Sequence, residues 1–413
     1  MKKEDIFVYF DHCFEAKPVL LGVLSPMSLR GKELFSFSFD ETFLKRKELP
    51  PLDPDLQFYS GVQFVNKPNF GIFMDSAPDR WGRKLMQRRE AMRAREAGEK
   101  PRTLSERDYL LGVFDETRMG ALRYKLTPDG EFQSNDRVLA APPWARLREL
   151  EEASRHFERE NVGDSHSKWL ALLFAPGSSL GGARPKANVT DSLGNLWIAK
   201  FPSHRDEYNV SSWEYASMLM AREAGINVPE CRIEKFSKDG STFLVKRFDR
   251  ICGRRVHFAS AMTLLGKTDG ADATEGSSYL ELAQFIEQYG ARPQEDLPEL
   301  WRRIVFSIAI SNTDDHLRNH GFLLTKQGWE LSPAYDINPN PDGKGLSLNI
   351  SDIDNALDFG LAMEVAPLFR LGTDSANKSL KRIREIVAHY SSYAKRASIA
   401  TSEVELMRSA FNA

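Results

Sequence analysis

The chain has 413 residues, of which 41% are hydrophobic and 28% are charged, and its formal net charge is −2. This length exceeds one ordinary hydrophobic core, so two or three domains are expected, and the composition is typical of a soluble globular protein. The near-neutral charge gives no indication of a protein that coats nucleic acid or an anionic membrane. The three cysteines are far apart and form no CxxC pair, which argues against a disulfide framework and favours a reducing compartment.

The N-terminal sequence gives no indication of export. The first five residues, Met-Lys-Lys-Glu-Asp, precede a short mixed strand rather than a long apolar segment, so no signal peptide is expected. The longest apolar runs, such as 169–175 and 304–310, are too short to span a bilayer. We therefore expect a cytoplasmic protein without a membrane partner.

A small antiparallel sheet is expected first, because residues 6–40 alternate apolar and polar side chains between turn-forming Gly and Asp. Residues 46–62 bear prolines and are expected to form a loop. A charged helix follows at 79–99; its basic face fits a polyanion, although a solvated surface is the commoner reason for such a run. Residues 106–124 predict a helix, a turn and a strand, and the first predicted domain is 1–125.

The second predicted domain, 140–250, follows a polar segment at 125–142 that is rich in Pro, Gly and Asp. Its expected helices are 144–160, 167–175 and 208–224, and its expected strands are a hairpin within 187–201 and a pair at 229–236 and 242–248. The third predicted domain, 251–413, has a loop rich in Gly, Asp and Thr at 266–277 and is mainly helical beyond Tyr279. A sheet-bearing part thus precedes a helical part.

Two consecutive glycines mark residues 178–186, here called the glycine segment, which reads Ser-Ser-Leu-Gly-Gly-Ala-Arg-Pro-Lys. Backbone N–H groups of such a segment can approach phosphate oxygens, because glycine has no Cβ in the way. It is not a Walker loop, since GxxxxGK[ST] is absent, and an ordinary tight turn also explains the two glycines. If the segment binds a nucleotide, the contacting residues are expected to be Ser179, Gly181, Gly182, Ala183 and Lys186.

Lys200 lies within the otherwise apolar strand Trp-Ile-Ala-Lys-Phe, and burying its ammonium group costs free energy unless that group reaches an anion. Protein kinases use a strand lysine to bind the α- and β-phosphates of ATP and hold it with a glutamate on a neighbouring helix. Glu214, on the helix predicted at 208–224, stands where such a partner is expected. An edge-strand lysine that extends to water accounts equally well for the pattern.

The segment 312–319 reads Asn-Thr-Asp-Asp-His-Leu-Arg-Asn, so Asp314 lies five residues before Asn319, and Asp336 follows after a short predicted strand. Protein kinases use this spacing: the first Asp accepts the proton of the substrate's hydroxyl, and the Asn and the second Asp hold Mg²⁺ on the nucleotide phosphates. Carboxylate and amide oxygens suit Mg²⁺. The pattern therefore indicates phosphoryl transfer.

The same segment contains two more residues with functional side chains, Asp315 and His316. Asp315 is the alternative base, but only Asp314 has the five-residue relation to Asn319. His316 is expected to pack or hydrogen-bond within the loop, because no cluster of partner ligands for zinc stands nearby. A polar loop without a catalytic role would account for any single motif, since Asn, Thr and Asp all favour turns. The order of the motifs along the chain argues against chance.

Together these motifs resemble the HipA-type serine/threonine kinases, the toxin halves of bacterial toxin–antitoxin systems. The resemblance is carried by Ser179-Leu-Gly-Gly-Ala-Arg-Pro-Lys186, Ile198-Ala-Lys-Phe-Pro202, Phe248-Asp-Arg250, Asn312-Thr-Asp-Asp-His-Leu-Arg-Asn319 and Tyr335-Asp336. Upstream, Phe73-Met-Asp-Ser-Ala-Pro-Asp79 and the stretch from Gly112 to Leu122 resemble the N-terminal region of that family. The resemblance therefore covers most of the chain.

The resemblance implies an α+β, two-lobed protein-kinase-like fold, with a mixed α/β N-terminal lobe of small antiparallel sheets and a mainly helical C-terminal lobe. It implies ATP and Mg²⁺ as cofactors. The site residues that it implies are Asp314 as catalytic base, Asn319 and Asp336 as metal ligands, Glu214 as support, and Lys200, Val245, Phe248 and His316 with the glycine segment as nucleotide contacts. Lys246 stands where the family often has an acidic residue beside the adenine, which leaves backbone groups of Val245 to Phe248 for that contact.

The resemblance also implies autophosphorylation of Ser179, with Ser178 as the alternative. A phosphoserine adds nearly two negative charges, so it would repel the nucleotide phosphates and silence the enzyme. The implied protein substrate is an aminoacyl-tRNA synthetase. The implied partner is a small helix-turn-helix antitoxin, through which alone the chain would meet DNA.

Two other functions stay open. A small-molecule phosphotransferase on the same fold, like those acting on aminoglycosides or choline, is disfavoured by the toxin-like N-terminal region. A catalytically silent kinase-like binding or repressor subunit is disfavoured because Lys200, Asp314, Asn319 and Asp336 are all present.

Overall fold

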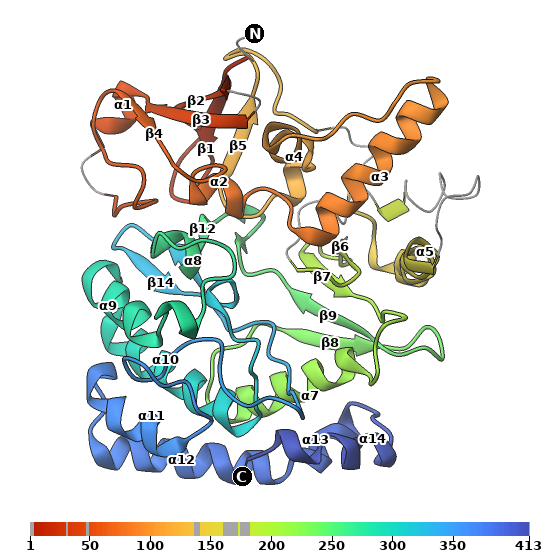
Figure 1. Cartoon of the computed structure of the whole chain (residues 1–413), viewed down its shortest axis with the longest axis vertical. Coiled ribbons are helices and arrows are strands. Elements are labelled where there is room, and N and C mark those ends of the chain that lie inside the picture. Colours follow the sequence, from red (N-terminus) through yellow and green to blue (C-terminus); the bar gives the residue numbers. More distant parts are fainter. Residues whose placement is uncertain are drawn as a thin grey trace. The chain divides into compact units, whose positions relative to one another are not determined.

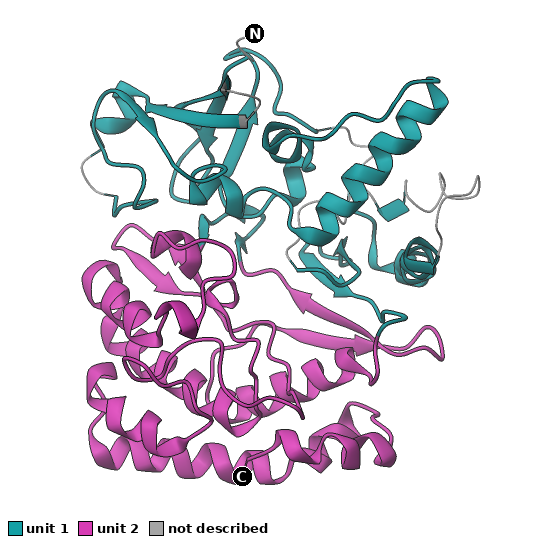
Figure 2. Cartoon of the chain, viewed as in Figure 1, with its two compact units in different colours: residues 1–205, 249–259 teal, residues 206–248, 260–413 magenta. Residues whose placement is uncertain are grey.

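The computed structural model describes residues 4–29, 32–46, 49–135, 141–159, 172–173 and 182–412. The chain divides into two compact units, each built from two separate stretches of sequence (Figure 2). Unit 1 comprises residues 1–205 and 249–259, and unit 2 comprises residues 206–248 and 260–413. The chain therefore leaves unit 1, returns to it for eleven residues, and leaves it again.

Unit 1 begins with a five-stranded antiparallel sheet in the order β4-β3-β2-β1-β5 (Figure 1). Its strands are β1 (Ile6–Phe10), β2 (Val19–Leu29), β3 (Lys32–Phe39), β4 (Val62–Phe64) and β5 (Leu122–Lys125). Ile6, Val8 and Phe10 are fully buried, as the two-residue period of a half-buried strand requires. Gly22 on β2 lies so close to β3 that a Cβ would come within 2.2 Å of the Ser38 carbonyl oxygen. The sheet predicted for residues 6–40 is confirmed.

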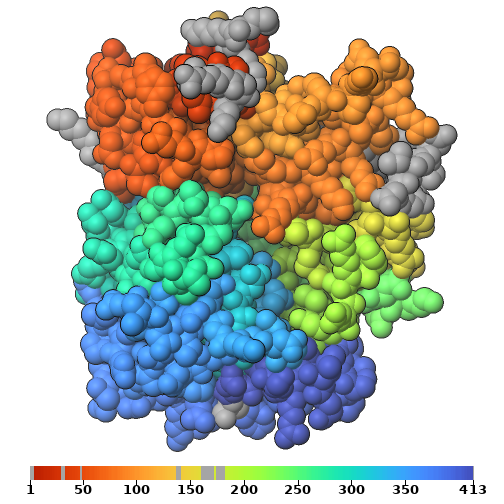
Figure 3. All heavy atoms as spheres, in the orientation of Figure 1, coloured from red at the N-terminus to blue at the C-terminus, as the bar shows by residue number. Residues whose placement is uncertain are grey.

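The other elements of unit 1 include the charged helix predicted at 79–99, which is α3 (Arg80–Glu96) and lies at the surface in Figure 3. They are α1 (Glu41–Leu44), α2 (Gly71–Asp75), α4 (Glu106–Gly112), the 3₁₀ turn Asp115–Thr117, α5 (Leu147–Arg159), and the hairpins β6 (Lys186–Thr190) with β7 (Leu196–Lys200) and β10 (Arg250–Ile251) with β11 (Arg254–Arg255). Most of the predicted helix at 167–175 falls outside the described residues. The hairpin predicted at 187–201 is confirmed.

Unit 2 is mainly helical and centres on α10 (Pro293–Ala309), which packs against α9, α11 and α12. Leu300, Trp301 and Ile304 of α10 are fully buried. The other elements are α7 (Val210–Glu223), β8 (Cys231–Glu234), β9 (Thr242–Lys246), β12 (Phe258–Ser260, which begins in unit 1), α8 (Ala261–Leu264), α9 (Tyr279–Tyr289), β13 (Gly321–Leu324), β14 (Trp329–Leu331), α11 (Phe359–Val365), α12 (Thr373–Ala388), α13 (Tyr390–Arg396) and α14 (Thr401–Leu406). The predicted α+β class, with small antiparallel sheets and a mainly helical C-terminal part, is confirmed. Within the described ranges, no helix has both the length and the apolar character that a membrane crossing needs.

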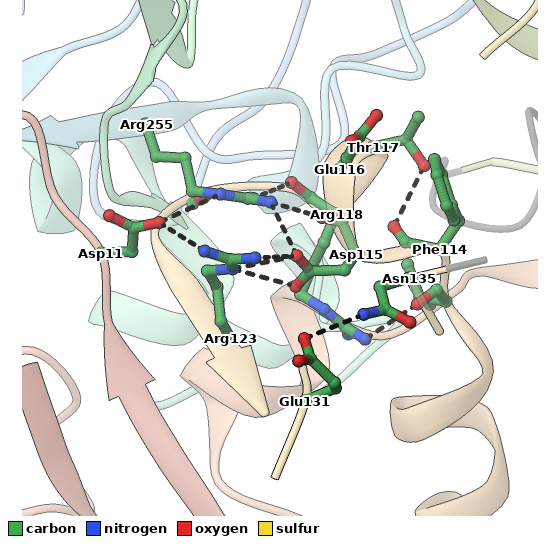
Figure 4. Close-up of polar contacts among 12 residues, drawn as sticks. Asp11, Phe114, Asp115, Glu116, Thr117, Arg118, Arg123, Glu131, Asn135 and Arg255 are labelled. Carbon is green, nitrogen blue, oxygen red and sulfur yellow. Dashed lines mark hydrogen bonds and ion pairs between the residues drawn. The ribbon is translucent and has the colours of Figure 1, made fainter. Parts of the chain in front are cut away.

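A buried ionic cluster joins the returning segment 249–259 to the rest of unit 1 (Figure 4). The carboxylate of Asp115 accepts hydrogen bonds from the Arg123 guanidinium on β5, at 2.5 and 2.9 Å. Arg255 on β11 lies 3.7 Å from the same carboxylate, and Arg123 also donates to Asp11 at the end of β1. Burial, together with the nearby Arg250, lowers the pKa of Arg255 to about 9. The cluster therefore depends on its carboxylates to hold several cations together.

Replacing Asp115 by Asn should destabilise unit 1. The substitution keeps the shape but removes the carboxylate between two guanidinium groups, and breaking a buried ion pair costs about 3–5 kcal/mol. Denaturant unfolding of Asp115→Asn would measure the loss. The matched control is Glu131→Gln, an exposed carboxylate at the edge of the cluster that only receives a 3.4 Å contact from Asn135, and it should change the free energy of unfolding by less than about 0.5 kcal/mol. Equal stability of the two variants would contradict this account of the cluster.

Candidate active site

The predicted site residues are divided between the two units. Unit 1 carries Gly182, Ala183, Lys186 and Lys200, and unit 2 carries Glu214, Val245, Phe248, Asp314, His316, Asn319 and Asp336. Ser178, Ser179 and Gly181 lie outside the described residues.

In unit 1 two lysines face each other across the β6–β7 hairpin. Lys186, the first residue of β6, is directly paired with Lys200, the last residue of β7. Like charges that stand directly opposite on neighbouring strands repel each other, so the pairing concentrates positive charge at this end of the hairpin. Lys186 is moreover only 8% exposed, which limits screening by water. An anion such as a phosphate group would turn this repulsion into attraction.

In unit 2 the segment from Asp314 to Asn319 folds back on itself. The side-chain Nδ2 of Asn319 donates a hydrogen bond of 2.8 Å to the backbone oxygen of Asp314, and the N–H of His316 donates to the same oxygen at 3.0 Å. The five-residue spacing therefore brings the two residues together. Asp314 is exposed and Asn319 is buried. An exposed carboxylate on a fixed loop can reach a proton on a bound substrate.

Asp315 has the opposite environment from its neighbour. Its carboxylate is buried and accepts hydrogen bonds from the hydroxyl groups of Tyr279 on α9 (2.7 Å) and Ser307 on α10 (3.1 Å). The ring of His320, just after the loop, lies 3.1 Å from its other oxygen. Burial raises the pKa of Asp315, but His320 and the two hydroxyl groups outweigh it and bring the pKa below its ordinary value. Asp315 thus holds the loop in place, which favours Asp314 as the base.

A small cavity of about 20 Å³ lies behind this loop. Arg303, Ser307, Asn312, Asp315 and Asn319 are among the residues that line it. That volume is enough for one water molecule among polar groups. The buried side of the loop and the end of α10 thus both contribute polar side chains to the lining of this cavity.

Asp336 is attached to the same loop. Tyr335 donates a hydrogen bond from its hydroxyl group to the backbone oxygen of Arg318 (2.7 Å), and the N–H of Asn338 donates to Oδ1 of Asn312 (3.1 Å). Asp336 itself has a φ angle of +58°, in the left-handed region. That conformation costs about 1–3 kcal/mol for a residue other than glycine and is found preferentially at functional sites. The two bonds hold Asp336 beside the loop despite this strain.

The oxygen atoms around Asp336 fit a hard cation such as Mg²⁺. Because Nδ2 of Asn319 is used in the bond to Asp314, its Oδ1 is left as an acceptor for a ligand. Asn338 donates from Nδ2 to Asp336 (3.3 Å), while its own buried Oδ1 accepts no hydrogen bond from the described residues. Carboxylate and amide oxygens are the donors that Mg²⁺ prefers. Asn338 was not predicted from the sequence, because an Asn two residues after Asp336 has no distinguishing pattern.

The residues expected around the base of a nucleotide also lie in unit 2. Val245 on β9 is buried and pairs with Cys231, and the Phe248 ring lies 5.7 Å from that of Tyr335, the neighbour of Asp336. The ammonium group of Lys246 lies 3.8 Å from Glu230 and is thus engaged at the protein surface. An acidic residue at position 246 is therefore not needed for the local structure.

Two further predicted residues of unit 2 have distinct environments. Glu214 is buried on α7, with 3% of its surface exposed. His316 keeps a buried Nδ1 that makes no hydrogen bond with the described residues. A ligand with a donor or acceptor could satisfy that nitrogen.

Replacing Asp315 by Asn should destabilise unit 2 by about 3 kcal/mol near neutral pH, because it removes a buried charge from its partners. Since the folded pKa of Asp315 lies below the unfolded one, its contribution is present above about pH 4 and is lost as the pH falls through the folded pKa. Denaturant unfolding of both proteins at pH 7 and pH 3 would show the difference narrowing at pH 3. The exposed Asp352→Asn variant is the control. A difference that stays constant with pH would contradict this role.

The comparisons with known proteins point to one family. The family described as HipA-like C-terminal domain matches residues 178–409, more than half of the chain. A protein of Haemophilus influenzae named "Putative kinase" is 31% identical over an alignment of 189 positions that covers 40% of this chain and 54% of the relative. The serine/threonine-protein kinase toxin HipA of Shewanella oneidensis is 25% identical over an alignment of 191 positions that covers 39% of this chain and 43% of the relative. The chain thus spans about half the length of these curated relatives, or less.

Among solved structures, HipA of Shewanella oneidensis MR-1, determined in a complex with HipB and operator DNA, has a TM-score of 0.68 to this chain. The match covers 98% of this chain and 94% of that chain at 16% identity, so it shows a shared fold. The resemblance expected from the sequence motifs is confirmed. The chain belongs to the HipA-like family.

Proposed function

We propose that the chain is an ATP- and Mg²⁺-dependent serine/threonine protein kinase of the HipA type. The observation that carries the proposal is the 314–319 loop, in which an exposed Asp314 and a buried Asn319 are joined by a hydrogen bond, while Tyr335, the neighbour of Asp336, bonds to the backbone of the same loop. These are the residue types and the order that phosphoryl transfer by kinases requires. Membership of the HipA-like family supports the same reading.

In the proposed reaction Asp314 accepts the proton of a substrate hydroxyl as its oxygen attacks the γ-phosphorus of ATP, and ADP leaves. Asn319 and Asp336, with Asn338 beside them, would hold Mg²⁺, which when bound neutralises charge on the phosphates. Asp315 would keep Asp314 oriented without taking a proton, because its carboxylate is buried and Oδ2 already accepts hydrogen bonds from Tyr279 and Ser307.

Lys186 and Lys200 are the proposed phosphate-binding cations, because they are paired at one end of the β6–β7 hairpin and together attract an anion. Val245 and Phe248 would contact the adenine, with Glu214 as support for Lys200 and His316 as a nucleotide contact. These roles follow the kinase pattern of strand lysine, helix glutamate and hinge.

The proposed cellular role is inhibition of growth through phosphorylation of a protein involved in translation, such as an aminoacyl-tRNA synthetase. Autophosphorylation of Ser179, or of Ser178, would switch the enzyme off, because the added charge repels the nucleotide phosphates. A small DNA-binding antitoxin is the proposed partner, in line with the HipB and operator DNA of the solved Shewanella complex.

Replacing Asp314 by Asn should lower phosphoryl transfer from ATP, both to the chain itself and to a protein substrate, by about 10²–10⁴-fold, because the general base is lost. Transfer of γ-³²P at saturating Mg-ATP would measure it. The matched control is Asp342→Asn, an exposed acid on a nearby loop of the same unit, which should keep full activity. Full activity of Asp314→Asn would sink the assignment of the base.

Replacing Lys200 by Met should weaken nucleotide binding while leaving the stability of the nucleotide-free protein largely unchanged. Without nucleotide, the free energy of unfolding should change by no more than about 1 kcal/mol, because Lys200 is partly exposed at the end of its strand. The stabilisation by Mg-ATP, about 2.7 kcal/mol at a hundred times the Kd in the unmodified protein, should largely disappear. Thermal unfolding with and without nucleotide would check both effects, with the exposed Lys326→Met as control. Undiminished stabilisation by Mg-ATP would exclude Lys200 from the phosphate site.

A further inference from the structure

The first turn of α3 holds the end of the glycine segment, although the two are 103 positions apart in the sequence. Asp79, the N-cap of α3, uses both carboxylate oxygens: Oδ1 accepts from the N–H of Arg80 (2.6 Å) and Oδ2 accepts from the N–H of Gly182 (2.5 Å). The N–H of Trp81 in turn donates to the carbonyl oxygen of Gly182 (3.1 Å). Both backbone polar groups of Gly182 are thus bound by α3.

Trp81 also holds the other end of the segment 182–186. Its indole Nε1–H donates a hydrogen bond of 2.8 Å to the backbone oxygen of Lys186, and its ring packs edge-on against Phe157 of α5 with centroids 5.2 Å apart. Trp81 is 2% exposed, so its indole is fixed by packing. The five residues from Gly182 to Lys186 are therefore attached to α3 at both ends, where α3 begins beside β6 (Figure 1).

This attachment determines where the Lys186 ammonium group lies. Gly182 has a φ angle of +77°, and a Cβ on it would come within 2.7 Å of Nζ of Lys186. The lysine thus curls back over Gly182, in a space that only glycine leaves open. The N–H of Gly182 is already used by Asp79, whereas the Lys186 ammonium beside it carries a positive charge that can attract a phosphate.

The second bond of Asp79 is not needed to cap the helix. The side chains of two other N-cap residues of unit 1 bond to their own helices: Asp40 accepts from the N–H groups of Thr42 and Phe43 of α1, and Ser105 accepts from the N–H of Asp108 of α4. Asp79 instead gives one oxygen to the helix and the other to the glycine segment. A carboxylate that binds a backbone N–H makes a strong, charge-assisted hydrogen bond.

We propose that Asp79 and Trp81 are positioning residues of the nucleotide site: they fix the backbone of Gly182 and Lys186 and so direct the Lys186 ammonium group toward the nucleotide phosphates. The inference rests on the proposed kinase function. It extends the site to α3, an element outside the segment matched by the family, which begins at residue 178.

The test compares Asp79→Ala, Asp79→Asn and Trp81→Phe with the control Asp40→Ala, which removes an N-cap that does not touch the glycine segment. Deuterium exchange of peptides covering 182–186 reports the attachment without any nucleotide, and should be about fivefold faster or more in Asp79→Ala and unchanged in the control. Asp79→Asn keeps one acceptor oxygen, so its exchange rate should lie between those of Asp79→Ala and the control. Trp81→Phe keeps a smaller aromatic ring but loses the indole N–H that donates to Lys186, so residues 182–186 should also exchange faster in this variant.

Nucleotide binding and kinetics complete the test. The KM for ATP should rise about tenfold in Asp79→Ala and in Trp81→Phe, with kcat within about threefold of the unmodified protein. At position 79 the KM should be highest with Ala, intermediate with Asn and lowest with Asp. Unchanged exchange in Asp79→Ala, or faster exchange with an unchanged KM, would overturn the positioning role while leaving the kinase function intact. Absence of any nucleotide binding by the unmodified protein would overturn the kinase function, and the positioning role with it.

Discussion

A carboxylate that is buried away from water must be compensated by hydrogen-bond donors or positive charges around it. In unit 2 Asp315 is such a carboxylate. Its partners come from three places: Tyr279 on α9, Ser307 on α10, and His320 after the loop. Burying this one charge therefore forces two helices and both ends of a loop to meet. Asp314 and Asn319, the two ends of that loop, are held in place because Asp315 is anchored to the two helices.

The two units carry complementary chemistry. Unit 1 supplies cations, with Lys186 and Lys200 paired across a hairpin, and these attract phosphate groups. Unit 2 supplies oxygen donors at Asn319, Asp336 and the neighbouring Asn338, and these suit a divalent cation. Asp336 adopts a left-handed conformation that is strained for a residue other than glycine. These two sets of residues support the proposal of phosphoryl transfer, because phosphate groups attract lysines and Mg²⁺ prefers oxygen ligands.

Much of the local structure could be predicted from the sequence, because it rests on short-range rules. The hairpin β6–β7 follows from alternating strands around Asp191 and Gly194, and helix α7 ends just before Gly225, which has a φ angle of +83°. The expected closeness of the Asp and the Asn five residues later is likewise a property of one loop. Strand β4 was not predicted, since three residues are too few for a pattern.

What could not be predicted depends on burial and on contacts between distant parts of the chain. Spacing favours Asp314 over Asp315 as the base, but the burial of Asp315 among hydrogen-bond donors could not be predicted from residue type. The bond between Asp79 and Gly182 joins positions 103 residues apart, and no spacing rule anticipates it. The return of residues 249–259 to unit 1 also depends on remote partners, because Arg255 meets Asp115 only in the folded chain.

The central claim is that this chain binds a nucleotide through its phosphates and a divalent cation. Isothermal titration with a non-hydrolysable ATP analogue, with and without Mg²⁺, tests it most directly. The account predicts binding that weakens about tenfold or more when Mg²⁺ is removed, because Asn319 and Asp336 would hold the metal and the metal would neutralise charge on the phosphates. Equal affinity with and without the metal, or no binding at all, would contradict it.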